Sequence, residues 1–151
     1  MQAVRGGLSG FGRFDRVTMP EMSEESRAVA DVLLAHHREV CRPVRIATEE
    51  ISDDLVNECT LTYGTVCERA GMPDLKRIVG QFLEEVAAWC ADNEWPPLNS
   101  LVVNAESLIP GGGYDGAGGL CAHHLWPQQV RECIKFREYP RAIPRAARRR
   151  K

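Results

Sequence analysis

Residues 62–80 read T-Y-G-T-V-C-E-R-A-G-M-P-D-L-K-R-I-V-G, and this stretch decides the fold. Thr62 stands where the N-cap of a helix is expected, and residues 63–70 predict one short helix after it. A turn at Gly71-Met72-Pro73 separates that helix from a second one. Two helices joined by a short turn that contains glycine are typical of a helix-turn-helix.

The second helix is predicted from Asp74 to Asp92, with Asp74 as its N-cap. Lys76 and Arg77 fall in its first turn, which is the part of a helix-turn-helix that reaches nucleic acid. We therefore expect both side chains to contact DNA. Glu84-Glu85 would repel phosphate farther along the helix, so only its first turns can lie against DNA. One face of the helix is apolar, with Leu75, Ile78, Val79, Phe82, Leu83, Val86 and Cys90.

Cap and periodicity signals on both sides of this stretch predict further elements. Ser23 and Thr48 are each placed to cap a helix, and Trp126-Pro127 begins the last one. A glycine-rich loop around Tyr114 follows the second predicted strand. The fold class we predict is mainly α with a small β component, a winged helix-turn-helix. The predicted helices span residues 24–40, 49–59 and 126–137, and the predicted strands residues 44–46 and 101–103.

We expect one chain in four parts. These are a flexible N-terminal segment (1–23), an N-terminal helical segment (24–60), the winged-helix domain (61–137) and a basic C-terminal tail (138–151). From Arg137 onward the chain has seven basic side chains and one acidic one, although its overall net charge is −2. An acidic body argues against indiscriminate coating of DNA. The basic tail could supply a sequence-independent phosphate contact or only solubilise the end of the chain.

Composition places the chain among ordinary globular proteins, with 44% hydrophobic and 26% charged residues. No apolar run approaches the roughly 18 residues that span a bilayer, and the N-terminus lacks an apolar signal core, so we expect a cytoplasmic protein. The cysteines are scattered, disulfides are not expected, and most are expected to be small buried apolar residues: Cys41, Cys59, Cys67, Cys90, Cys121 and Cys133.

Cysteine and histidine side chains also raise the question of a metal site. Cys121, His123 and His124 could ligate zinc, but no second ligand pair has a recognisable spacing. The glycine-rich loop lacks the G-x-x-x-x-G-K-[ST] pattern of a phosphate-binding P-loop. We therefore expect no metal and no cofactor.

With these motifs in place, residues 62–83 resemble the DNA-binding half of the alkylguanine-DNA alkyltransferases and the alkyltransferase-like proteins. Tyr63 matches the tyrosine that opens the first helix of that family. The A-G-x-P turn and the R-x-V-G helix start are matched by Ala70-Gly71-Met72-Pro73 and Arg77-Ile78-Val79-Gly80. A weaker similarity continues downstream through Leu101-Val102-Val103-Asn104, Gly113-Tyr114 and Gly118-Gly119.

The resemblance implies a domain that binds the minor groove of DNA. Arg77 would enter the base stack where a nucleotide flips out, and Tyr63 would press on the phosphate of that nucleotide. Lys76 and the loop with Gly113 and Tyr114 would complete the interface. Filling the vacated stack offsets part of the unstacking energy of about a few kcal/mol.

The chain departs from this family at the site of chemistry. The enzymes need a P-C-H-R motif whose thiolate accepts the alkyl group, whereas residues 96–101 read P-P-L-N-S-L. Alkyl transfer to cysteine is therefore excluded at this site. Asn99 and Ser100 would line the pocket, and Ser100 has no neighbouring base in the sequence that would make it a nucleophile.

Purely structural roles remain possible for two of the residues assigned to the DNA interface. Arg77 could pair with Asp74 on a solvated surface, and Tyr63 could be a packing aromatic. Three functions follow: a non-catalytic DNA-binding protein of the alkyltransferase-like type, a module that docks a protein partner through an acidic helical face, and a metal-dependent enzyme. DNA is the partner we favour, and no membrane contact is expected.

Overall fold

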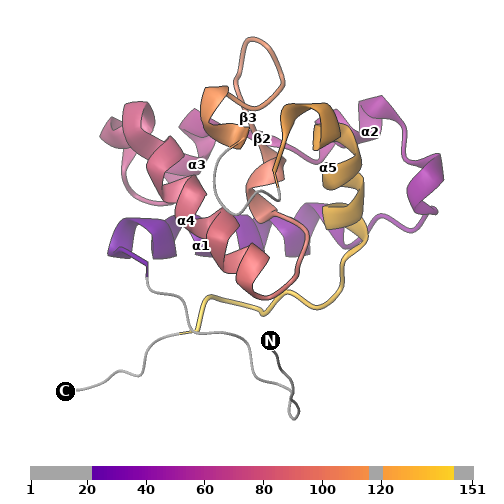
Figure 1. The fold of residues 1–151 in the computed structure, drawn as a ribbon, viewed down its shortest axis with the longest axis horizontal. Helices are drawn as coiled ribbons and strands as arrows, with labels where there is room; N and C mark the ends of the chain where they lie inside the picture. The colour runs from indigo at the N-terminus through magenta and orange to yellow at the C-terminus, as the bar shows by residue number, and fades with distance from the viewer. Residues whose placement is uncertain (1–21, 116–120, 145–151) are drawn as a thin grey trace.

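The computed structural model describes residues 22–115 and 121–144, and this part of the chain is mainly helical (Figure 1). The predicted N-terminal segment up to residue 21, Gly118-Gly119 and the last seven residues of the basic tail lie outside the described residues. The α-helices are α1 (Glu24–His36), α2 (Asp53–Glu58), α3 (Tyr63–Arg69), α4 (Val79–Asp92) and α5 (Trp126–Lys135). Shorter helical turns are η1 (His37–Cys41), η2 (Thr48–Glu50), η3 (Pro73–Ile78), η4 (Leu98–Leu101), η5 (Gly112–Asp115) and η7 (His123–Leu125).

A small parallel sheet joins two distant parts of the chain. Strand β2 (Leu61–Thr62) pairs with β3 (Val102–Val103), and Leu61 lies opposite Val102. Valine and leucine suit a strand that is buried on both faces, and both residues of β3 are buried. The predicted strand at residues 101–103 is thus present over its last two residues, while Leu101 belongs to η4.

The core lies where α1 packs against α4. Ser23 caps α1 as predicted, because its hydroxyl accepts a hydrogen bond from the Ser26 amide. Val29 and Leu33 lie on one face of α1 at helical spacing and are fully buried, as is Val86 of α4. All six cysteines are free and buried, as the sequence predicted.

The first half of the predicted helix-turn-helix is present. Thr62 caps α3 through a hydrogen bond from the Thr65 amide to its hydroxyl. Gly71 then takes a φ of +79°, the left-handed region that favours glycine. The predicted turn therefore follows from local signals alone.

The prediction for the second helix was wrong at its start. Asp74 is not an N-cap, because residues 73–78 form the 3-10 turn η3 and the α-helix begins only at Val79. Leu75 departs from helical geometry with φ −102° and ψ 17°, and Ile78 with φ −115° and ψ 7° separates η3 from α4. Lys76 and Arg77 thus lie on a tight turn that precedes the α-helix.

Two predictions between α1 and α3 were also wrong. Residues 44–46 form no strand; the Lys135 ammonium and the Arg137 guanidinium donate to carbonyls of this segment instead. Thr48 begins only the short turn η2. The longer helix does not form because Ser52 is the effective cap, accepting a hydrogen bond from the Leu55 amide and starting α2.

The chain after α5 returns along α1 (Figure 1). The Ile143 amide donates to Asp31 at 2.8 Å, and the Arg27 guanidinium donates to the Pro144 carbonyl at 3.0 Å. Ile143 is buried. The first residues of the predicted basic tail are therefore packed against the body of the protein. Within the described residues, no helix is long and apolar enough to cross a bilayer.

Stability should depend on pH through His37, which is buried where η1 meets α5. Its Nε2 donates to the Cys133 carbonyl at 2.7 Å. The pKa of His37 is lowered from 6.5 to about 4, mainly by burial and in addition by the Arg137 and Arg42 guanidinium groups. The unfolded chain therefore binds the extra proton first, and stability is lost as the pH falls from about 6.5 toward 4. The loss should be on the order of 2–3 kcal/mol for this group.

Urea denaturation at pH 7 and at pH 4.5 measures this loss. His37→Gln is expected to flatten the pH dependence, and His124→Gln, which changes an exposed histidine, is the matched control. An unchanged slope in His37→Gln would contradict the assignment.

The turn should depend on glycine at residue 71 but not at residue 80. A Cβ at either position meets nothing within 4 Å, so only backbone conformation matters. Gly71→Ala is expected to cost about 1 kcal/mol because of its positive φ. Gly80→Ala, in α4, is expected to stabilise by about 0.5–1 kcal/mol because alanine favours the helix. Thermal and urea unfolding of the two variants give the comparison, and shifts of the same sign would count against it.

Candidate nucleic-acid interface

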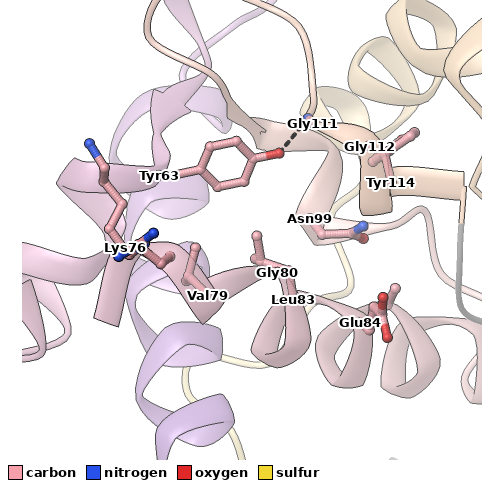
Figure 2. A pocket seen from close by; sticks show the side chains of 12 residues that line it. Tyr63, Lys76, Val79, Gly80, Leu83, Glu84, Asn99, Gly111, Gly112 and Tyr114 are labelled. Atoms are coloured by element: carbon pink, nitrogen blue, oxygen red, sulfur yellow. Dashed lines mark hydrogen bonds between the residues drawn. The ribbon is translucent and has the colours of Figure 1, made fainter. Parts of the chain in front are cut away.

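A cavity of about 210 Å³ opens between α3, the start of α4 and the segment that contains η4 and η5 (Figure 2). Its walls come from two blocks of sequence, residues 63–87 and 99–114, which the pairing of β2 with β3 holds side by side. The lining residues are Tyr63, Lys76, Arg77, Val79, Gly80, Leu83, Glu84, Ala87, Asn99, Gly111, Gly112 and Tyr114.

Most residues predicted from the sequence to form the site meet at this cavity. Tyr63, Lys76, Arg77, Asn99 and Tyr114 all line it. The predicted Gly113 lies in η5, between two lining residues. The predicted Ser100 does not line it: this residue is fully buried, and its hydroxyl has no hydrogen-bond partner among the described residues.

Sequence reasoning missed the wall that α4 contributes. Leu83, Glu84 and Ala87 lie three, four and seven residues after Gly80, so the four residues share one face of α4. That spacing was visible in the sequence. The prediction placed Leu83 on the apolar face of the helix and Glu84 where it would repel phosphate, and so separated two residues that line one cavity.

Tyr63 ties α3 to the glycine-rich segment. Its hydroxyl accepts a hydrogen bond of 2.5 Å from the Gly111 amide (Figure 2). A Cβ at residue 111 would lie 3.1 Å from that hydroxyl oxygen, so glycine permits the close approach. Tyr63 is half-buried. It therefore has a structural hydrogen bond while its ring forms part of the cavity wall.

The open side of the cavity carries positive charge from η3. Lys76 and Arg77 are both exposed. The stem of Lys76 passes over Gly64, with its Cδ 3.6 Å from where a Cβ would stand. In the described part of the chain, the one ion pair is between Arg131 and Asp53, so Arg77 is not paired with Asp74. Two cations therefore face solvent at the cavity without a carboxylate partner.

The inner part of the cavity presents one polar group, the Asn99 amide, and one aromatic ring, that of Tyr114. Asn99 is buried, and its amide nitrogen lies 3.6 Å from the Cys121 sulfur. Tyr114 is also buried, and its hydroxyl donates to the Gln129 amide oxygen at 2.6 Å. A neutral amide and an aromatic ring can bind a planar polar group, but neither supplies a nucleophile.

The residues considered for a metal site have other neighbours. The Cys121 thiol lies against Asn99, and His123 places Nε2 at 3.1 Å from the Pro110 carbonyl while its ring packs edge-on against Tyr114. His124 is exposed. Across residues 22–115 and 121–144, no three histidine, cysteine or acidic side chains are grouped to hold a metal ion.

The chemistry available in the cavity follows from its lining. Among the described residues that line it there is neither a cysteine nor a histidine. Cys121 contacts Asn99 but does not reach the cavity itself.

Comparison of the chain with protein-family models, with curated proteins and with solved structures finds no match.

Removing the Tyr63 hydroxyl should loosen the glycine-rich segment. Tyr63→Phe leaves the Gly111 amide without its partner, at a cost of about 1 kcal/mol. Hydrogen exchange at Gly111 and Gly112 is expected to accelerate while the amides of α1 and α4 stay protected. Tyr114→Phe is the matched control, because it removes a hydroxyl that bonds to Gln129 instead. Equal protection of Gly111 in wild type and Tyr63→Phe would refute the role of this bond.

Proposed function

We propose that this protein binds duplex DNA and accepts an extruded nucleobase in the cavity, acting by recognition without catalysis. The observation that carries the proposal is the cavity itself. It combines aromatic and aliphatic walls with one buried amide, and it opens beside the two exposed cations of η3, Lys76 and Arg77. This is the function expected from the resemblance to the alkyltransferase-like proteins.

Base extrusion makes chemical demands that this lining could meet. A flipped base is held by stacking on aromatic or apolar side chains and by hydrogen bonds to its edge. Tyr63, Leu83 and Tyr114 offer apolar surface, and the Asn99 amide can both donate and accept. Arg77 stands at the exposed rim, where its side chain could enter the vacated stack.

The fold we propose for this role is a variant of the winged helix-turn-helix. In it, α3, η3 and the start of α4 would lie against the duplex, and the segment around η5 would take the place of a wing. Glu84 also lines the cavity. Its carboxylate would repel phosphate, so the contact with the DNA backbone at this opening would come from Lys76.

Binding titrations of the full chain against duplex DNA, followed by fluorescence anisotropy at two salt concentrations, test the proposal. Affinity is expected to fall steeply with salt. Arg77→Ala should weaken binding by roughly tenfold, because a guanidinium in such a contact contributes about 1–3 kcal/mol. Arg69→Ala removes the same charge from an exposed position of α3 outside the cavity and should change affinity little.

A second comparison isolates base extrusion from backbone contact. Duplexes with a mismatch or an alkylated guanine should bind more tightly than a matched duplex, because less energy is needed to extrude the base. Gly80→Leu places a side chain at the cavity wall, where a Cβ meets nothing within 4 Å. This variant is expected to lose that preference and keep salt-dependent binding. Equal duplex affinity of wild type and Arg77→Ala would refute the interface.

A module that docks a protein partner is the second candidate, and one groove favours it. An open depression of about 500 Å³ runs between α1 and the end of α3. Val32 and Ala35 line it together with Asp31, Glu39 and the basic Arg69. Two carboxylates against one guanidinium beside apolar surface fit a basic amphipathic segment. Negligible duplex affinity at low salt, together with a stable partner that co-purifies, would favour this candidate.

A further inference from the structure

A second cavity, of about 100 Å³, lies between the end of α1, η1 and the returning segment after α5. It shares no lining residue with the candidate nucleic-acid interface. Buried His37 and half-buried Tyr139 form part of its wall, and four arginines surround them: Arg38, Arg42, Arg137 and Arg141.

Backbone carbonyls hold part of this arginine cluster in place. Arg38 donates to the carbonyl of Arg141 at 2.8 Å, which links η1 to the returning segment. Arg137 donates to the Ile134 carbonyl at 2.8 Å and to the Arg42 and Val44 carbonyls at 3.2 Å. Two of the guanidinium groups are therefore positioned by contacts that cross the fold, before any ligand arrives.

Among the described residues, no carboxylate balances the positive charge of the cluster. In residues 22–115 and 121–144, no carboxylate lies within ion-pair distance of these arginines, since the one ion pair is that of Arg131 with Asp53. Besides burial, the guanidinium groups of Arg42 and Arg45 lower the pKa of Arg137 by repulsion. Like charges held together without compensation favour binding of an anion.

Stabilisation of helix ends accounts for only part of the cluster, including the hydrogen bond from Arg137 to the Ile134 carbonyl in the last turn of α5. Cations near the C-terminal end of a helix interact favourably with its dipole, and this could explain Arg38 and Arg42 in and just after η1. Arg137 and Arg141 come from beyond the end of α5, so a second segment contributes half of the charge. Convergence of two segments on one recess is what a binding site requires.

We propose that this recess binds a phosphate group. Guanidinium groups form paired, charge-assisted hydrogen bonds with phosphate oxygens, and several of them can surround one tetrahedral anion. The recess has room for a single small anion. The same chemistry would serve free phosphate or the terminal phosphate of a nucleic-acid strand.

Calorimetric titration of the full chain with inorganic phosphate, at constant ionic strength set with sodium chloride, tests this site. Arg42→Gln and Arg141→Gln are the informative variants, because in the described structure neither side chain makes a hydrogen bond that supports the fold. Each is expected to weaken phosphate binding roughly tenfold. Arg69→Gln removes an equal charge outside the recess and should leave the affinity unchanged.

Comparing the affinities of two short oligonucleotides, one with a 5′-phosphate and one with a 5′-hydroxyl, shows whether the bound phosphate is that of a strand end or free phosphate. A gain in affinity from the 5′-phosphate that disappears in Arg42→Gln assigns the site to strand ends. Binding of inorganic phosphate without such a gain assigns it to free phosphate. Absence of phosphate binding, or equal affinity in wild type, Arg42→Gln and Arg141→Gln, overturns the proposal.

The phosphate site is independent of the proposed function. Arg77→Ala and Gly80→Leu change residues of the other cavity and should leave the affinity for inorganic phosphate unchanged. Failure of duplex binding would therefore not remove the phosphate site.

Discussion

The pairing of β2 with β3 is the constraint on which the candidate interface depends. Leu61 lies opposite Val102 and Thr62 opposite Val103, so residues some forty positions apart are held in one register. Tyr63 follows β2 directly and bonds to Gly111 beyond β3. Because parallel strands place their ends at the same edge, the start of α3 and the glycine-rich segment must lie together. The cavity is the space that remains between them.

Local signals predicted what depends on a few neighbouring residues. The Thr62 cap, the turn at Gly71 and the helix between them each rest on one hydroxyl or one backbone angle, and all were predicted correctly. The start of α4 was not, because Asp74 offered a cap in the sequence whereas Leu75 and Ile78 leave helical geometry in the fold. Ile78 precedes α4 without a side-chain cap, so the start of this helix depends on how residues 73–78 fold, which a single sequence does not display.

The site was predictable in its residues but not in its shape. Tyr63, Arg77 and Tyr114 were found by resemblance and motif, and they do share a cavity. The part played by α4 was missed because a helix face that lines a cavity has the same periodicity as one that packs against a core. The arginine recess was missed for another reason: Arg38 and Arg137 are a hundred residues apart and meet only because the chain returns along α1.

The charge distribution explains why a chain with a net charge of −2 can still have sites for anions. Exposed charges act over roughly one Debye length, about 8 Å at physiological salt, so local arrangement outweighs the total. Lys76 and Arg77 form one local excess of positive charge, and the arginine recess forms another. The acidic residues elsewhere would disfavour contact over a broad surface. Binding is thus expected to be confined to these two places, which favours recognition of a defined feature over coating of the polymer.

The buried amide of Asn99 determines which polar interactions the inner part of the larger cavity can make. An amide carries no ionisable proton, so the polar group it presents stays the same across the physiological pH range. It can hold a base edge and can neither attack nor accept an alkyl group. The nearby Cys121 thiol contacts this amide and stays outside the cavity. Asn99 therefore presents a group suited to binding, whatever enters the cavity.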